Sequence, residues 1–297
     1  RYLDDPFRGT IDRHVLDAGQ TSLSLECGAA RKALGALGIG PRDIDITLCA
    51  SFLGDHPGLG NGAFLAKELE LTGPAWNVES TCSGSLAAFD LAASLIDSGR
   101  ADRILVVTSC DYSRRIEETD LLSWTSGDGA AAFVVGRATE DRGLLASYFV
   151  PTTSTCGALY FEYAPMGTSE HGIRMQCTAE AGRLLRETSD DCIRQTCERA
   201  MEKAGVHVDD VAHFIFASPT AWYVDFCARS LRIDPRRCTN TYPQFANIGP
   251  VCWLANLHEH ARVQGIRAGD IVLLCAIGSV SSAGAIVAKF GTMALGE

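Results

Sequence analysis

The sequence lacks both an excess of positive charge and a long hydrophobic run. Its 36 acidic residues outnumber the 26 lysines and arginines, so the formal net charge is −10. Nucleic-acid binding relies on clustered basic residues, which argues against nucleic acid as the main partner. A membrane-spanning helix needs about 20 consecutive apolar residues, and no stretch approaches this length. We therefore predict a globular protein with neither a nucleic-acid nor a membrane partner.

The chain also lacks the cysteine spacings typical of zinc sites, although it contains 12 cysteines. No C-x-x-C occurs, and several cysteines lie in or beside apolar, strand-like runs, where a free cysteine behaves as a small hydrophobic residue. The glycine-rich stretch at 58–62 does not have the spacing of a phosphate-binding loop. We therefore predict reduced thiols, no metal, no nucleotide site and a cytoplasmic location.

An internal repeat is present. Residues 29–51 and 200–218 each show a helical pattern, a glycine near its end, an acidic turn and a short apolar strand ending in Ala-Ser. Aligning Ser51 with Ser218 gives an offset of 167 residues, and the same offset pairs 104–107 with 271–274. Strands that alternate with helices favour a mainly parallel or mixed sheet covered by helices.

We therefore predict two duplicated α/β halves. The first half spans residues 1–140 and the second spans 181–297. Residues 141–180 are rich in Gly, Thr, Ser and Pro, which favours an irregular connection with one short strand. Because the sequence begins with Arg1 and not with methionine, we expect that residues preceding it are missing.

A candidate nucleophile lies in residues 76–98. A short strand-like segment leads into Ser-Thr-Cys82-Ser-Gly-Ser, which opens a helix of small and apolar residues. Small side chains let the backbone turn sharply and let a substrate approach. The positive end of a helix dipole favours the thiolate form of a cysteine, and a thiolate can take over the acyl group of a thioester. We predict that Cys82 carries an acyl group and that its thiol pKa is lowered.

Five segments, in this order, resemble the thiolase superfamily and within it the β-ketoacyl-ACP synthase III branch. They are 79–84 (ESTCSG), 99–109 (GRADRILVVTS), 126–136 (SGDGAAAFVVG), 245–250 (FANIGP) and 276–284 (AIGSVSSAG). The resemblance covers nearly the whole chain, and part of the family's length is absent before its first residue. It implies a five-layered α-β-α-β-α fold made of two duplicated halves, and a homodimer. It also implies no permanently bound cofactor, with acyl-CoA or the phosphopantetheine arm of an acyl carrier protein as the substrate carrier.

The resemblance further implies roles for single residues. Asn247 falls where the family's asparagine hydrogen-bonds the thioester carbonyl or the developing enolate, although by itself it could be a turn residue. The backbone N–H groups of Cys82 and Ser279 would form the oxyanion hole. By the 167-residue offset Asn247 is the counterpart of Ser80, so both loops should meet at one site.

The family's His-Gln-Ala-Asn segment is missing. An ungapped alignment places Ala217 in the histidine position, and a small shift would offer Ser218 or Thr220. Of the histidines elsewhere, we expect His213, His258 and His260 to be surface or capping residues. His56 precedes a proline in a loop that the family uses at its dimer interface, so it could approach an active site.

The missing histidine bears on the reaction. Decarboxylative condensation with malonyl-ACP needs donors that hold an enolate, and removing one such donor typically costs about 100- to 1,000-fold in rate. Transfer of an acyl group to a thiol needs less, whereas an alcohol acceptor would need a general base that the sequence does not plainly supply. We therefore favour an acyltransferase of natural-product or polyketide biosynthesis that moves an acyl group through Cys82 to a second carrier or small acceptor. The alternatives are a genuine synthase III and a non-catalytic partner subunit.

One basic stretch interrupts the acidic sequence. Its arginines are Arg229, Arg232, Arg236 and Arg237. The stretch is consistent with a solvated helix end or with a docking patch for an acidic partner. The family's acidic carrier protein docks near this segment, which favours the docking patch.

Overall fold

The computed structural model describes residues 5, 7–56, 58–138, 142–166, 169–279 and 281–296. Arg1, from which we expected that preceding residues are missing, lies outside the described residues. The helices are α1 (Ser22–Leu37), α2 (Gly62–Leu69), α3 (Gly84–Asp97), α4 (Ala181–Ala204), α5 (Tyr223–Ser230), α6 (Tyr242–Phe245) and α7 (Cys252–Val263). The strands are β1 (Ile46–Cys49), β2 (Ala75–Asn77), β3 (Arg103–Asp111), β4 (Asp128–Gly136), β5 (Gly143–Pro151), β6 (Leu159–Met166), β7 (Ser169–Cys177), β8 (His213–Phe216), β9 (Ile271–Ile277) and β10 (Ser282–Lys289).

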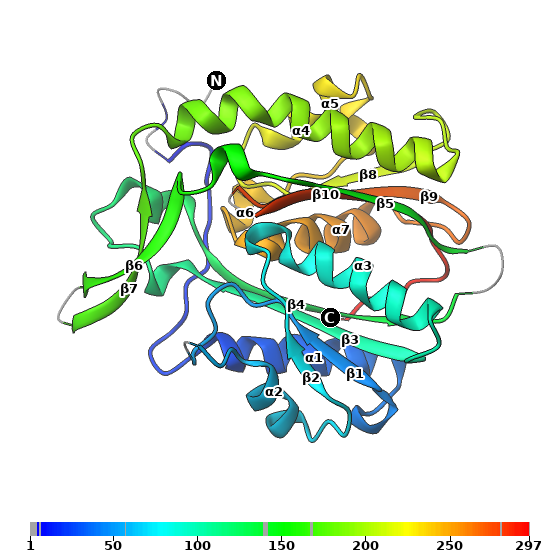
Figure 1. Ribbon diagram of the computed structural model, residues 1–297, viewed down its shortest axis with the longest axis horizontal. Coiled ribbons are helices and arrows are strands. Elements are labelled where there is room, and N and C mark those ends of the chain that lie inside the picture. Colours follow the sequence, from blue (N-terminus) through cyan, green and yellow to red (C-terminus); the bar gives the residue numbers. More distant parts are fainter. Residues whose placement is uncertain are drawn as a thin grey trace.

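Two four-stranded mixed sheets form the framework. The first has the order β2-β1-β3-β4 and the second the order β5-β10-β9-β8. In each sheet a parallel pair is followed by an antiparallel return of the chain: β1 and β3 are parallel and β4 pairs antiparallel with β3, and β8 and β9 are parallel and β10 pairs antiparallel with β9. Figure 1 shows α3 and α7 between the sheets, α1 and α2 below the first sheet, and α4 and α5 above the second. The predicted five-layered arrangement is therefore confirmed.

The repeat is visible in the element bounds. Shifting Ile46–Cys49 (β1) by 167 residues gives His213–Phe216 (β8). The same shift brings α3 onto α7 within one residue, and β3 onto β9. The counterpart of β2 is the short helix α6, whose second residue is Pro243, a residue suited to the first turn of a helix and not to a paired strand. The duplication is real, and its halves differ at this edge.

The prediction of an irregular connection at 141–180 is wrong. β5 pairs antiparallel with β10 and so belongs to the second sheet, where it covers an edge that would otherwise expose backbone polar groups. β6 and β7 pair with each other as a hairpin, which projects from the side of the layered body in Figure 1. The Gly- and Thr-rich composition indicated turns, and for this reason the apolar residues of β5, β6 and β7 were not recognised as strands.

All 12 cysteines of the sequence are free thiols, and most of them are buried. Among the described residues no helix is both long and apolar enough to cross a membrane. Over the same residues no cluster of His, Cys, Asp and Glu has the arrangement of a metal site.

Candidate active site

Cys82 lies in a one-turn 3-10 helix, η2 (Thr81–Ser83), directly before the central helix α3. Thr81 has a φ of +46°, in the left-handed region that non-glycine residues rarely adopt, and its N–H donates to the Glu79 carboxylate at 2.6 Å. The turn is therefore held in an unusual conformation that presents the cysteine at the start of the helix. This is the position that the small residues around Cys82 predicted.

The environment of the Cys82 thiol differs from the prediction. Burial raises its pKa to about 11, the Tyr112 hydroxyl at 3.8 Å opposes this rise, and the Glu79 carboxylate adds to it. The predicted lowering of the thiol pKa is therefore wrong for the structure. A helix N-terminus favours the thiolate, but removal of the sulfur from water disfavours the charged form more strongly here.

The glycine-rich C-terminal loop packs against this turn. A Cβ on Gly278 would lie 2.5 Å from Thr81 Oγ1 and 2.8 Å from Ser83 Oγ, so the close approach requires glycine. The Thr152 hydroxyl donates to the Gly278 carbonyl at 2.6 Å, and the Thr155 hydroxyl donates to the Ser279 carbonyl. The structure thus brings Ser279 beside the Cys82 turn with its peptide anchored, while its role in an oxyanion hole stays a prediction.

Serine hydroxyls fasten these two loops together. Ser80 Oγ lies 2.8 Å from Ser282 Oγ and 3.1 Å from Ser281 Oγ. Ser83 Oγ donates to the Ser282 carbonyl at 2.9 Å. We did not single out this network from the sequence, although serine-rich stretches around Cys82 and before β10 were a signal that could have indicated it.

Asn247 is oriented by two donors on its carbonyl oxygen. The Gly249 N–H lies 2.9 Å and the Cys252 thiol 3.6 Å from Asn247 Oδ1. A backbone N–H can only donate, so this contact identifies the oxygen and leaves the amide Nδ2 free to donate on its other side. Asn247 therefore does form a turn contact, and the same contact presents its amide as a hydrogen-bond donor.

The two predicted loops meet between the sheets. Ser85 Oγ, in the first turn of α3, donates to the Pro250 carbonyl at 2.6 Å and accepts from Trp253 Nε1 at 2.7 Å. The turn η2 also contacts η7 (Gly249–Val251), the 3-10 turn that follows Asn247. The duplication thus brings the Cys82 and Asn247 segments to one site, as the offset predicted.

Ser218 and Thr220, the candidates for the vacant histidine position, have different surroundings. Ser218 is buried, accepts from Asn256 Nδ2 at 3.2 Å and hydrogen-bonds the Cys252 thiol. Because Cys252 contacts Asn247, Ser218 is connected to the site through that thiol. Thr220 Oγ1 is buried and has no hydrogen-bond partner among the described residues.

Two histidines and an aspartate form a hydrogen-bonded chain, of which only His260 is fully buried. His213 Nε2 lies 3.1 Å from Asp270 Oδ2, and His213 Nδ1 lies 2.8 Å from His260 Nε2. His260 is fully buried in α7, so its predicted surface or capping role is wrong. Helical periodicity places it on α7, but only the packing of β8 against that helix shows which face is covered.

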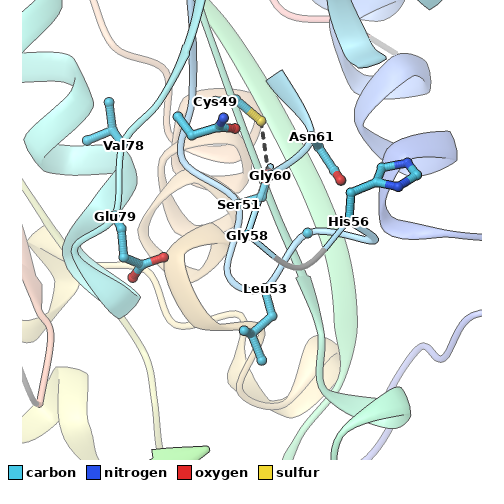
Figure 2. Close-up of a pocket in the computed structure, with 11 residues that line it drawn as sticks. Cys49, Ser51, Leu53, His56, Gly58, Gly60, Asn61, Val78 and Glu79 are labelled. Atoms are coloured by element: carbon cyan, nitrogen blue, oxygen red, sulfur yellow. Dashed lines mark hydrogen bonds between the residues drawn. The ribbon is translucent and has the colours of Figure 1, made fainter. Parts of the chain in front are cut away.

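His56 lines a cavity of about 140 Å³ beside the first sheet. Its ring stacks on Phe64 with centroids 3.6 Å apart, and Figure 2 shows His56 and Glu79 on opposite sides of the cavity. The cavity floor includes Cys49 and Ser51, whose side chains are 3.1 Å apart. Since Glu79 holds the Cys82 turn, His56 borders a pocket next to that turn, but among the described residues it forms no hydrogen bond to the Cys82 sulfur.

The arginines of the basic stretch fall into two classes. Arg236 pairs with Asp234 at 2.7 Å, and Arg237 donates to the Val208 carbonyl at 3.2 Å while lying over the Phe214 ring. Arg229 and Arg232 are exposed, and no acidic side chain in the described segments pairs with either. Arg237 therefore serves the local packing, and Arg229 and Arg232 are the free charges of the predicted docking patch.

Two family models match the chain. The model for "3-Oxoacyl-[acyl-carrier-protein (ACP)] synthase III" matches residues 76–151, which contain Cys82. The model for "3-Oxoacyl-[acyl-carrier-protein (ACP)] synthase III C terminal" matches residues 201–290, which contain Asn247 and Ser279.

Relatives and solved structures agree with these models. The β-ketoacyl-[acyl-carrier-protein] synthase III of Brucella suis is 29% identical over 290 residues, covering 95% of this chain and 88% of the relative. The protein of that name from Agrobacterium fabrum is also 29% identical over 290 residues, with the same coverage. The 3-oxoacyl-[acyl-carrier-protein] synthase III structure from Aquifex aeolicus has a TM-score of 0.83 at 24% identity, covering 94% of this chain and 87% of that one. OleA of Xanthomonas campestris has a TM-score of 0.81 at 19% identity, covering 95% of this chain and 87% of that one. At these identities the structures show the fold alone, which is thiolase-like.

Proposed function

This chain belongs to the 3-oxoacyl-[acyl-carrier-protein] synthase III family, and from this premise we propose that it is an acyltransferase in which Cys82 carries the acyl group. The observation that carries the proposal is the meeting of three elements at one site. They are a cysteine at the start of α3, the Asn247 amide donor, and the anchored Ser279 loop. The family's histidine position, in contrast, falls by ungapped alignment on Ala217, and a small shift would place Ser218 or Thr220 there.

The reaction proceeds by two thioester exchanges. The Cys82 thiolate attacks the carbonyl carbon of an acyl-CoA or acyl-ACP, a new C–S bond forms, and the bond to the carrier sulfur breaks. The departing carrier thiolate takes up the proton that Cys82 lost. The N–H groups of Cys82 and Ser279, with the Asn247 amide, hold the negative charge on the carbonyl oxygen in each tetrahedral intermediate. A second carrier thiol then repeats the exchange and removes the acyl group.

A carrier protein would dock at the end of α5. Arg229 lies in the last turn of that helix and Arg232 follows it, both exposed and unpaired among the described residues. Their positive charge stands out on a chain of net charge −10, so an acidic carrier would be attracted to this place and repelled elsewhere. Replacement of both by glutamate should raise the KM for an acyl carrier protein and leave the KM for acyl-CoA nearly unchanged.

The second candidate is decarboxylative condensation with malonyl-ACP. The names of the relatives and the retained Asn247 favour it, whereas the missing imidazole removes one of the donors that an enolate needs. We also propose a cytoplasmic homodimer that works in polyketide or natural-product biosynthesis. The free thiols suit a reducing compartment, and the dimer and the pathway rest on the family resemblance.

Mass spectrometry tests the acyl-enzyme directly. Wild-type protein mixed with acyl-CoA or acyl-ACP should gain one acyl group on the peptide that contains Cys82, and Cys82→Ala should gain none. The exposed Cys156 offers a matched control, because Cys156→Ala should be acylated as fast as the wild type. Subsequent addition of a carrier protein should discharge the adduct. Release of carbon dioxide with an extended chain from malonyl-ACP would replace transfer by condensation, and a wild type without any adduct would contradict both.

A further inference from the structure

The side chain of Tyr112 ends at the sulfur of Cys82. Its hydroxyl oxygen lies 3.8 Å from Cys82 Sγ, a distance that permits a hydrogen bond to sulfur. Within the described residues it is the only side-chain group hydrogen-bonded to this sulfur. Tyr112 follows β3 by one residue, so it enters the site from the neighbouring strand and not from the loops of the duplicated motifs.

Tyr112 is held firmly in this orientation. It opens a 3-10 turn, η3 (Tyr112–Arg114), and its side chain is 4% exposed. The residue before it, Asp111, pairs with Arg115 at 2.9 Å, and the N–H of Ser113 after it donates to the Asp128 carboxylate at 2.8 Å. Its ring packs edge-on against Phe52, with centroids 5.5 Å apart. The hydroxyl therefore cannot turn from the sulfur without disturbing several contacts.

Opposite the phenol, the second half of the molecule approaches closely through a glycine. Gly249, the counterpart of Cys82 by the 167-residue offset, has a φ of +58° and carries no side chain. A Cβ there would lie 3.6 Å from Tyr112 Oη and 3.0 Å from Cys110 Sγ. The glycine thus lets η7 approach the phenol closely while only the Cys82 side chain reaches the hydroxyl.

The phenol can donate a hydrogen bond to this sulfur once the thiol has ionised. Burial raises the pKa of Tyr112 well above its ordinary value, and the neighbouring thiols of Cys82 and Cys110 raise it further. The hydroxyl therefore keeps its proton. A neutral donor stabilises a thiolate more than a thiol, because hydrogen bonds to an ionised acceptor are the stronger ones. Accordingly, this contact lowers the Cys82 pKa against the effect of burial.

We propose that Tyr112 is a catalytic hydrogen-bond donor that holds the Cys82 thiolate during acyl loading and release, at a site from which the family's imidazole is missing. The inference deepens the proposed function and rests on it. When Cys82 loses its proton, the Tyr112 O–H donates to Sγ. When Sγ forms its bond to the acyl carbon, the carrier thiolate leaves. It takes up one proton from solvent, which balances the proton that Cys82 released. Tyr112 remains a phenol throughout, so it exchanges no proton or electron with the substrate.

The test measures the thiol itself and does not require a substrate. Tyr112→Phe removes the hydroxyl and retains the ring that packs on Phe52. Iodoacetamide reacts with the thiolate form, so the rate of Cys82 alkylation, followed by peptide mass spectrometry over a range of pH, reports its ionisation. In Tyr112→Phe the thiolate loses a hydrogen bond to a charged group, so Cys82 should be alkylated about 10-fold more slowly, or slower still, near neutral pH. The midpoint of the alkylation profile should shift to higher pH.

Tyr223→Phe is the matched control. Tyr223 is equally buried and lies in the core between the second sheet and α4, where its hydroxyl is near the Cys227 thiol and not near Cys82. Its loss should leave Cys82 alkylation unchanged. An unchanged or lower midpoint in Tyr112→Phe, in protein whose thermal unfolding matches that of the wild type, overturns the proposal. Should Tyr112→Phe unfold, replacement of the tyrosines by 3-fluorotyrosine provides the second measurement, because the more acidic phenol donates a stronger hydrogen bond to the thiolate; an unaltered midpoint of Cys82 alkylation there overturns the proposal as well.

Failure of the proposed function has a different signature. Wild-type protein that never forms an acyl adduct would contradict acyl transfer, whereas the alkylation profiles of wild type and Tyr112→Phe would still show whether the phenol holds the thiolate.

Discussion

In the first half of the molecule the turn before the central helix carries Cys82, and at the equivalent place in the second half stands Gly249. At this pair of equivalent positions the first half has a thiol and the second half has no side chain. Ser80, two residues before the cysteine, corresponds to Asn247. The two halves therefore share a backbone framework, and under the proposed function they divide the chemistry, with the nucleophile in the first half and an amide donor in the second.

The two equivalent serines that follow β1 and β8 also differ in their partners. After β1, Ser51 donates to the buried carboxyl of Glu26, whereas after β8, Ser218 accepts from the buried amide of Asn256. Burial raises the pKa of Glu26, because its carboxylate form would be isolated from water. The Asn256 amide does not ionise, so its burial has no corresponding effect. The serine thus bonds a group that can ionise in the first half and one that cannot in the second.

The largest expected effect comes from removing the side chain of Asn247, compared with removing that of its counterpart Ser80. Asn247→Ala removes a donor to the carbonyl oxygen, and we expect acyl loading to slow by about 100- to 1,000-fold. Ser80→Ala, at the counterpart position, removes the hydroxyl contacts to Ser83, Ser281 and Ser282 and should slow loading by less than about 10-fold. Single-turnover acylation followed by mass spectrometry measures both rates. Equal losses in the two variants would show that the halves do not divide the chemistry as we infer.

A smaller effect is expected on stability from the amide beneath the second site. Asn256 accepts from the Thr241 N–H and hydroxyl, both at 2.8 Å, and donates to the Phe216 carbonyl at 2.7 Å. Asn256→Ala leaves these groups buried without partners, so the free energy of unfolding should fall by about 2–4 kcal/mol. Chemical denaturation measures this change. Asn240→Ala, which loses a single described side-chain donor bond to the Ala221 carbonyl and an acceptor bond from Tyr242, serves as the milder control.

The smallest effect is a pair of opposite pH dependences. Burial lowers the pKa of His260 to about 4, so between pH 6.5 and 4 the unfolded chain binds a proton that the folded chain does not. Stability should therefore fall as pH drops through this window, by up to about 1.4 kcal/mol per pH unit. For Glu26, whose folded pKa is raised above 4.5, stability is present at low pH and falls as pH rises toward that folded value.

Unfolding curves of His260→Gln and Glu26→Gln over a pH series check both signs. His260→Gln should flatten the acid side of the profile, and Glu26→Gln should flatten the side above the ordinary carboxyl range. His207→Gln, on the surface, is the matched substitution for the histidine. A wild-type slope that persists in His260→Gln would assign the acid sensitivity to another group.

Much of the site could be predicted from local patterns. Cys82 is preceded by a short strand and followed by small residues, and this arrangement places a residue at a helix start whatever the rest of the chain does. Asn247 was paired with Ser80 by the offset, because a duplicated backbone brings equivalent turns together. The strands β5, β6 and β7 were missed, since turn-forming residues hid the apolar positions that pair with β10 and with each other.

By itself the sequence determined the two-fold framework, the position of Cys82 and the absence of a histidine after β8. These features depend on the order of residues along a short segment, which sets helix and strand periodicity and turn positions. Only the tertiary structure decided the ionisation of Cys82, the contact with Tyr112 and the burial of His260. Each of these features depends on how segments far apart in the chain pack together and exclude water. The exclusion of water shifts the pKa of a group, and no local sequence pattern shows where it occurs.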